Sequence, residues 1–187
     1  VTGFDRENLY YQVEHLTGKQ KDIFIQNYIE THPNESGIIY CATRKNVDTL
    51  YEKLLKQGVS VTRYHAGMSN DIRKKSQDDF IYDRAQVVIA TNAFGMGIDK
   101  SNVRFVIHYN MPQSMENYYQ EAGRAGRDGE PAEGQPVFPA DGAGAQPAGY
   151  RLPRYYEYAG LIRHSNPARG GPLTARRALL RCARARC

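Results

Sequence analysis

The chain has 187 residues, with 25 Lys and Arg against 20 Asp and Glu, which gives a formal net charge of +5. This length suffices for one domain with its own hydrophobic core, and the basic balance suggests an anionic partner such as nucleic acid. No run of apolar residues is long enough to span a membrane. The chain begins without Met and without a basic-then-apolar leader, so we expect an internal fragment with no secretory signal and no membrane partner.

Charge and composition change after Glu133. Residues 1–133 contain 16 Lys and Arg and 18 Asp and Glu, a net charge of −2, whereas residues 134–187 contain nine Arg and two acids, a net charge of +7. The second segment is also dominated by Gly, Ala, Arg and Pro. We therefore predict a folded domain over 1–133 and an irregular basic tail over 134–187.

The hydrophobic pattern of the first segment predicts alternating helices and strands. Helices are expected at about 19–31, between the predicted strands 37–41 and 59–64, at 69–82 with Ser69 as cap, and at 114–126. Strands are expected at 37–41, 59–64, 86–91 and 105–109. This alternation is typical of an α/β domain with a parallel sheet that is covered on both faces.

Individual positions follow from these elements. The second helix should bury one stripe and end at Gly58; the stripe contains Val47, Leu50, Tyr51, Leu54 and Leu55. The third helix should contact the core through Ile72, Phe80 and Ile81. Cys41 lies in an apolar strand, which predicts a buried, inert thiol. Cys182 and Cys187 lack the spacing and further ligands of a zinc site, so no metal site is predicted.

In parallel sheets, ligands bind beyond the carboxyl ends of the strands. The segments that follow three of the predicted strands are rich in Gly, hydroxyl and polar groups: 43–44, 65–67 and 91–97. Backbone amides at Gly95 and Gly97, with hydroxyls from Thr43 and Thr91, could hold phosphate oxygens.

The most specific pattern is the segment 118–129. On a helix, Gln120, Arg124 and Arg127 would lie at i, i+4 and i+7 on one stripe, and guanidinium groups match phosphate geometry. The alternative is a solvated basic helix end. Two glycines inside a helix cost about 1 kcal/mol each, which a merely solvated face would not justify.

Several motifs together resemble the RecQ family of superfamily 2 DNA helicases. Gln120-x-x-Gly123-Arg124-x-Gly126-Arg127 resembles motif VI, and 90–100 resembles motif V in its RecQ form. Segment 37–44 resembles motif IV, 64–69 resembles the segment after it, and Phe4-x-Arg6-x-Asn8-Leu9 resembles the segment that leads into the second lobe. A DEAD-box RNA helicase would be expected to have His-Arg in place of Gln120-Glu121.

The resemblance implies the C-terminal RecA-like lobe of an ATP-dependent 3′-to-5′ DNA helicase that unwinds DNA in recombination and repair. The fold would be an α/β three-layer sandwich with a mostly parallel sheet. Arg127, and secondarily Arg124, would be arginine fingers that reach the γ-phosphate. Gln120, Gly97 and Asp99 would lie beside the nucleotide. The DNA path would be lined by Thr43, Arg44, His65 and Thr91.

Two of these roles have structural alternatives. His65 could instead be a strand-end histidine that hydrogen-bonds backbone, and Asp99 could cap the turn before Asn102.

The resemblance also implies ATP and Mg²⁺ as cofactors, bound mainly by an N-terminal lobe that would be this chain's partner. Single-stranded and partly duplex DNA would be the other partners, in the cytoplasm or nucleoid of a bacterium or the nucleus of a eukaryote. The sequence lacks a phosphate loop of the form Gly-x-x-x-x-Gly-Lys-Ser/Thr; its nearest segment is Thr17-Gly18-Lys19-Gln20. We therefore expect this chain alone to be inactive as an ATPase.

The tail departs from the family, which continues with an apolar strand and a four-cysteine zinc region. A shifted reading frame from about Glu133 would explain the departure, and the lobe would then lack its last strand. The alternative is a disordered basic arm that binds nucleic acid. Two other functions stay open: a non-catalytic nucleic-acid-binding module, and the second lobe of a superfamily 2 RNA helicase.

Overall fold

The structure is a computed structural model that describes residues 8–11, 14–16, 18–95, 98–110, 112 and 114–138. Gly97 and residues 139–187 lie outside the described residues. Predictions for the tail beyond Phe138, including an irregular or frameshifted segment, therefore stay predictions.

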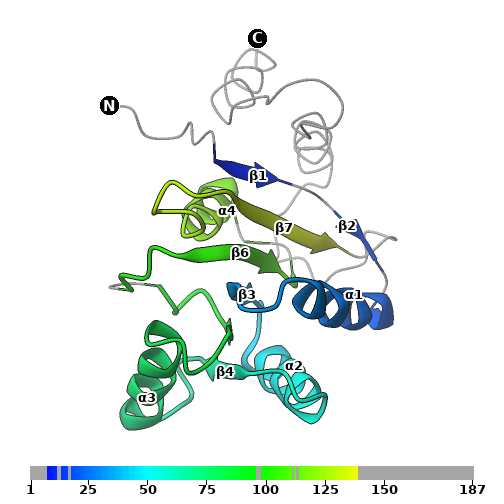
Figure 1. The fold of residues 1–187 in the computed structure, drawn as a ribbon. Helices are drawn as coiled ribbons and strands as arrows, with labels where there is room; N and C mark the ends of the chain where they lie inside the picture. Colours follow the sequence, from blue (N-terminus) through cyan, green and yellow to red (C-terminus); the bar gives the residue numbers. More distant parts are fainter. Residues whose placement is uncertain are drawn as a thin grey trace.

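The described chain contains a sheet whose strands run in one direction (Figure 1). The strands are β1 (Leu9–Tyr11), β2 (Glu14–His15), β3 (Ser36–Tyr40), β4 (Val61–Tyr64), β5 (Val87–Ala90), β6 (Val103–His108) and β7 (Ala132–Phe138). Their order is β1-β7-β6-β3-β5-β4, β2 also pairs with β7, and each pairing is parallel. The predicted parallel α/β sheet is confirmed.

Helices connect the strands in the order that the sequence predicts. They are α1 (Gly18–Thr31), α2 (Arg44–Lys56), α3 (Asn70–Ile81) and α4 (Met115–Ala122). Thr43, Ser69 and Ser114 cap the last three, because each side chain accepts a hydrogen bond from the backbone N–H three residues on. Gly58, just beyond α2, has a φ of +80°, which favours glycine at this helix end.

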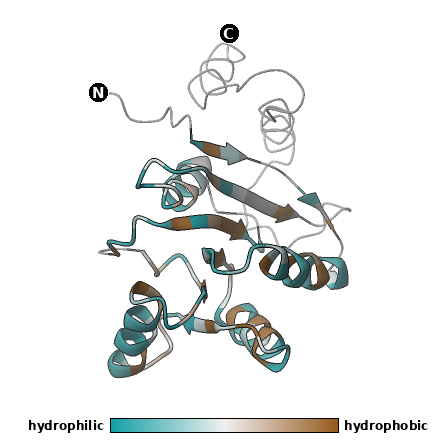
Figure 2. Cartoon of the chain, viewed as in Figure 1, coloured by the Kyte–Doolittle hydropathy of each residue, from teal (hydrophilic) through white to brown (hydrophobic). Residues whose placement is uncertain are grey.

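Two hydrophobic cores lie on opposite faces of the sheet, because side chains alternate along each strand. On one face, Ile39 and Ile89 of the strands pack with residues of α1 and α2 such as Ile25 and Leu50. On the other face, Ile38 and Val88 pack with Phe80 of α3, the turn residue Phe94 and Ala125. Figure 2 shows hydrophobic residues in brown on β6 and on parts of α1 and α2, whereas α3 is mostly teal and hydrophilic. The three-layer α/β sandwich is confirmed.

Some predicted core contacts are wrong. Leu55 is 50% exposed and Ile72 is 54% exposed, because each lies at the solvent side of its helix. Val47, Leu50, Leu54 and Phe80 are buried as predicted. Cys41 is also buried, and burial raises the pKa of its thiol, as expected of an inert cysteine.

The last strand crosses the boundary that composition predicts at residue 133. β7 pairs with β6 from Phe105↔Glu133 to His108↔Pro136 and with β1 on its other side. Val137 is fully buried in the core that contains α1 and α2. β7 therefore continues the described sheet past residue 133, and the predicted division into lobe and tail stays a prediction. Within the described residues, no helix is long and apolar enough to cross a membrane.

Candidate functional site

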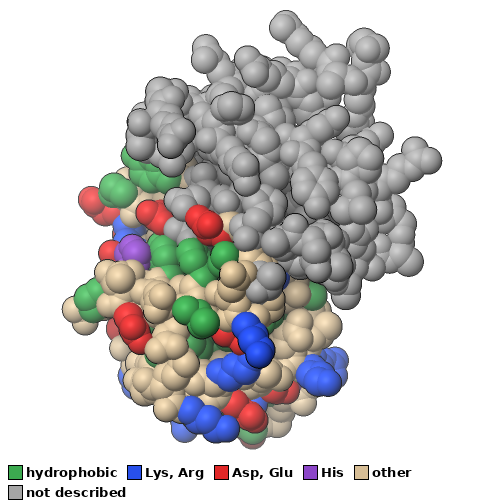
Figure 3. Space-filling view, turned by 90° about the vertical axis from the view of Figure 1, so that its right-hand side faces the viewer, with side chains coloured by type: hydrophobic (Ala, Val, Ile, Leu, Met, Phe, Trp, Pro, Cys, Tyr) green, Lys and Arg blue, Asp and Glu red, His purple; other side chains and the backbone are tan. Residues whose placement is uncertain are grey.

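The carboxyl ends of the central strands are aligned, which brings four connecting segments to one edge of the sheet. Tyr40 at the end of β3 pairs with Ala90 of β5 and His108 of β6, and Tyr64 of β4 also pairs with Ala90. The predicted site residues follow these ends. Figure 3 views the molecule from the side toward which the β6 and β7 arrows point; on its described part, basic and acidic side chains are intermixed.

The helix α4 ends earlier than predicted. It stops at Ala122 with Gly123 as its C-cap, and Arg124 and Ala125 continue in a tighter turn, donating to the carbonyls of Glu121 and Ala122. Gly126 then has a φ of +59°. The two glycines therefore end the helix instead of lying inside it, and Gln120, Arg124 and Arg127 do not form one helical stripe. We refer to residues 123–131 as the arginine loop.

Arg124 connects the arginine loop to the turn after β5. Its Nη1 donates to the Gly95 carbonyl at 2.7 Å. Gly95 has a φ of +130°, and a Cβ there would lie 2.3 Å from Cζ of Arg124. In the residue before it, the carbonyl of Phe94 accepts a hydrogen bond from the Tyr40 hydroxyl at 3.2 Å. The segments that resemble motifs IV, V and VI thus meet at one point.

Arg127 differs from Arg124 in being exposed. Among the described residues, no hydrogen-bond or ion-pair partner is found for its guanidinium. Burial raises the pKa of Tyr40, and both Arg124 and Arg127 oppose that shift because their positive charges are nearby. Both arginines therefore contribute positive charge near the carboxyl end of β3, and Arg127 is the one free to contact an added anion.

A pair that the motif analysis missed anchors α4 to the sheet. His108, 1% exposed at the end of β6, has its Nε2 2.9 Å from Oε2 of Glu121. Its ring stacks on Tyr40, with a centroid distance of 5.5 Å, and lies 5.0 Å from the ring of Tyr118. The available signal was a histidine that ends the apolar run Phe105-Val106-Ile107. Gln120, adjacent to Glu121, is exposed.

The residues predicted to line a DNA path follow the ends of β3, β4 and β5. Thr43 and Arg44 are exposed, and the Thr43 hydroxyl is engaged as the cap of α2. The side chain of Arg44 lies over Gly67, where a Cβ would be 3.2 Å from both Cδ and Nη1 of Arg44. Thr91 is half-buried, and its carbonyl accepts from the Phe94 N–H. The structure thus brings Arg44 and Gly67 together at the surface.

His65 has protein partners at both ring nitrogens. Nδ1 accepts from the Gly67 N–H at 3.2 Å, and Nε2 lies 3.1 Å from Oδ1 of Asp48. Because a backbone N–H can only donate, the neutral ring carries its proton on Nε2. Arg63 contacts the same carboxylate at 2.7 Å. This geometry matches the structural alternative for His65, and its DNA contact stays a prediction.

The remaining predicted nucleotide residues are less defined. Gly97 lies outside the described residues, and Asp99, two positions on, is exposed. Its neighbour Lys100 is buried and pairs with Asp83 at 2.7 Å. Within the part of the chain that the structure describes, no group of three or more His, Cys, Asp or Glu could hold a metal ion.

Comparisons with known proteins agree with this architecture. The family model for the helicase conserved C-terminal domain matches residues 20–129. The chain is 54% identical over 132 residues to the ATP-dependent DNA helicase RecQ of Bacillus subtilis (strain 168), which covers 71% of this chain and 22% of that relative. It is 48% identical over 147 residues to the protein of the same name from Haemophilus influenzae, covering 78% of this chain and 23% of the relative.

A solved structure gives the same fold. Saccharomyces cerevisiae Dbp5, in a variant bound to RNA and ADP BeF3, superposes with a TM-score of 0.64 at 26% identity, covering 70% of this chain and 35% of that one. The chain described here thus spans less than a quarter of the two curated relatives and about a third of this structural neighbour.

Proposed function

Because this chain belongs to the helicase conserved C-terminal domain family, and within it to the RecQ family of superfamily 2, we propose that it acts as the second lobe of an ATP-dependent 3′-to-5′ DNA helicase. In this role it supplies Arg127 and Arg124 to a nucleotide bound mainly by an N-terminal lobe. It also supplies part of the track for single-stranded DNA. The observation that carries this proposal is the exposed guanidinium of Arg127, which has no partner among the described residues, beside the engaged Arg124.

The residues of the arginine loop fit a triphosphate. Arg127 is permanently charged and offers a planar fork of donors to phosphate oxygens, and within the described part of the chain its guanidinium has no ion-pair partner. ATP with Mg²⁺ supplies, when bound, the phosphoanhydride bond whose hydrolysis drives unwinding. Arg127 would stabilise the negative charge that develops on the transferred phosphoryl group, a role worth roughly 10³ to 10⁵ in rate. Arg124 would orient the loop through Gly95, and Gln120, Gly97 and Asp99 would lie beside the nucleotide.

Contacts with the nucleic acid would come from the segments after β3, β4 and β5. Arg44, exposed at the N-terminus of α2, can contact a backbone phosphate, and the hydroxyls of Thr43 and Thr91 lie on the same sheet edge. His65 would act there by fixing the Gly67 backbone. An enzyme that uses ATP and DNA would work inside the cell, where both occur.

The test is Arg127→Ala in the complete two-lobed enzyme. We expect DNA-stimulated ATP turnover to fall by about 10³-fold or more, while nucleotide affinity, measured with a fluorescent ATP analogue, changes little. Arg84→Ala is the matched control, since Arg84 is an exposed arginine that pairs with Asp79 at the end of α3 and lies over the Tyr82 ring. Wild-type turnover in Arg127→Ala would overturn the proposal, as would ATP hydrolysis by this chain alone, which lacks a phosphate loop.

Two other functions make different predictions. An RNA helicase lobe would give stronger ATPase stimulation by single-stranded RNA than by DNA of the same sequence, a comparison that the complete enzyme allows. Dbp5, the structural neighbour bound to RNA, keeps this alternative open. A non-catalytic binding module would have no phosphate loop or acidic metal-binding strand elsewhere in its gene.

A further inference from the structure

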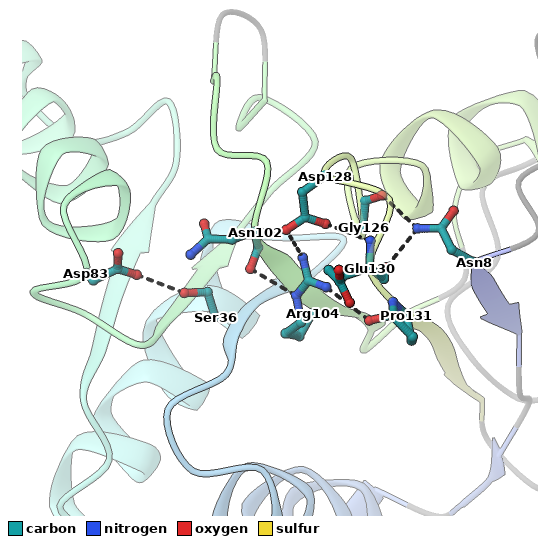
Figure 4. Close-up of polar contacts among 9 residues, drawn as sticks. All are labelled: Asn8, Ser36, Asp83, Asn102, Arg104, Gly126, Asp128, Glu130 and Pro131. Carbon is teal, nitrogen blue, oxygen red and sulfur yellow. Dashed lines mark hydrogen bonds and ion pairs between the residues drawn. The ribbon is translucent and has the colours of Figure 1, made fainter.

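Two side chains from distant parts of the chain contact the arginine loop (Figure 4). Their partners in the loop lie before and after Arg127 in the sequence. One of the two side chains is that of Asn8, immediately before β1, and the other is that of Arg104, near the start of β6. Neither belongs to the loop, and Asn8 is 118 positions away from its partner Gly126.

Asn8 uses both N–H groups of its amide. Nδ2 donates to the Gly126 carbonyl at 2.8 Å and to the Glu130 carbonyl at 2.7 Å, so one side chain bridges the loop on either side of Arg127. The main chain adds a further bond, because Ala132 N–H donates to the Asn8 carbonyl at 2.9 Å. The fit is close: a Cβ on Gly126 would lie 2.6 Å from Nδ2 of Asn8.

Arg104 binds the same loop from the β6 side. Its guanidinium donates to the Pro131 carbonyl at 3.1 Å through Nη1 and to the Asn102 carbonyl at 3.3 Å through Nε. Nη2 forms an ion pair with Asp128, the residue that follows Arg127. Asp128 in turn accepts from the Glu130 N–H at 3.1 Å, and the hydrogen bond from Arg104 is the main reason why the pKa of the Asp128 carboxyl is lowered.

We propose that Asn8 and Arg104 are positioning residues for Arg127, which fix the loop so that its exposed guanidinium is held in the orientation that phosphoryl transfer requires. This inference rests on the proposed function. The loop contains two glycines with positive φ, Gly126 and Gly129, and would otherwise sample many conformations. A misplacement of about 1 Å at a reacting group can cost about 100-fold in rate, so the contacts of Asn8 and Arg104 matter for turnover as well as for folding.

The first variant is Asn8→Asp in the complete enzyme. The carboxylate has the shape of the amide but no N–H, and it faces two carbonyl oxygens. We expect kcat for DNA-stimulated ATP hydrolysis to fall about 10- to 100-fold, with the KM for ATP and the affinity for DNA within about threefold. Asn27→Asp, the same change at an exposed position of α1, is the matched control and should leave all three unchanged.

A double-mutant cycle separates positioning of Arg127 from general weakening of the lobe. If Asn8 acts through Arg127, Asn8→Asp added to Arg127→Ala should lower kcat by less than about twofold further, measured with radiolabelled ATP. An equal fold-loss in the presence and absence of Arg127 would overturn the inference. If Arg127→Ala itself kept wild-type turnover, the proposed function would fail instead, so the two failures are distinguishable.

Arg104→Gln provides a second variant if Asn8→Asp does not fold. This change removes the ion pair between Arg104 and Asp128. The Arg104 side chain is 18% exposed, so the substitution is made at a partly exposed position. The same pattern is expected: a lower kcat, an unchanged KM and no further loss in Arg127→Ala. An unchanged kcat in a folded Arg104→Gln enzyme would contradict the role of Arg104.

Discussion

At position 95, the guanidinium of Arg124 lies where a side chain would project from the backbone. The φ of +130° already favours glycine, and the close approach of Arg124 adds a second requirement. Backbone strain at a positive φ can be separated from the close approach of Arg124 by comparison with Gly58. Gly58 has a positive φ of +80°, and nothing lies within 4 Å of a Cβ built there.

We expect Gly95→Ala to lower the free energy of unfolding by about 1–3 kcal/mol through backbone strain, and also to displace Arg124 from the Gly95 carbonyl. In the complete enzyme, ATP turnover should fall well below that of Gly58→Ala, which suffers only strain. Chemical denaturation and steady-state ATPase assays measure the two effects. Equal turnover in the two variants would show that the Arg124 contact has no role in catalysis.

Single positions differ in how far sequence could predict them. The motif pattern identified Arg124 and Arg127 as exceptional, and the structure separates them into an engaged and an exposed arginine. His65 could not be resolved from sequence, since its partner Asp48 lies on a different element. Asn8 and Arg104 were not identified as loop contacts, because most of their acceptors are backbone carbonyls whose positions only the folded loop defines, and Asp128, the acidic partner of Arg104, lies 24 positions away along the chain.

At the level of elements, the turn after α3 is joined to the start of β3 and to the segment before β6 by one carboxylate. Asp83 accepts from Nζ of Lys100 at 2.7 Å and from the Ser36 hydroxyl at 3.0 Å. The Lys100 side chain is only 3% exposed, whereas that of Asp83 is 62% exposed. The hydrogen bond from Lys100 is the main reason why the pKa of Asp83 is lowered.

We expect Asp83→Asn to lower the free energy of unfolding at neutral pH by about 1–3 kcal/mol, because it leaves the buried ammonium of Lys100 without a counter-charge. Asp79→Asn, which removes the partner of the exposed Arg84, should cost less than about 1 kcal/mol.

The pH dependence follows from the direction of the pKa shift. Since the folded-state pKa of Asp83 lies below its unfolded value of about 4, the stabilisation is complete above that value and is lost as pH falls through the folded pKa. Urea denaturation between pH 2 and 7 should therefore show wild type and Asp83→Asn converging at low pH. A constant difference down to pH 2 would contradict this assignment.

Sequence periodicity located the elements well and their ends less well. Continuous apolar runs such as Ile38-Ile39 and Val87-Val88-Ile89 predict strands buried on both faces, and these strands form the centre of the sheet. The extent of α4 was wrong because Gly123 and Gly126 fit either a helix interior or a helix end in sequence. Contacts made in the folded protein accompany the second arrangement: Arg124 donates to the Gly95 carbonyl, and the Gly126 N–H donates to the Val103 carbonyl.

For the molecule as a whole, the described sheet extends past the change in composition near residue 133. Composition changes there, yet β7 continues through it and lies between β1 and β6. Composition is an average over many residues, whereas a strand joins a sheet through a few positions. Val137 is such a position, since its side chain is fully buried.

Val137→Asp tests whether the residues after 133 belong to the folded lobe. We expect it to lower the free energy of unfolding by about 3–5 kcal/mol, because a carboxylate would be buried without a partner. Ile23→Asp, at a position that is 58% exposed on α1, is the matched control and should cost no more than about 0.5 kcal/mol. Thermal unfolding followed by circular dichroism measures both, and equal unfolding temperatures would place residue 137 outside the fold.

The pairing of β1 with β7 has a consequence for how the protein is made. Among the described strands, β1 pairs only with β7, which is the last of them along the chain. During translation at about 5–20 residues per second, the N-terminal strand therefore emerges from the ribosome long before the strand that it pairs with. Until then Asn8 has no carbonyls to bind, so the contacts that orient Arg127 can form only after nearly all of the described lobe has been synthesised.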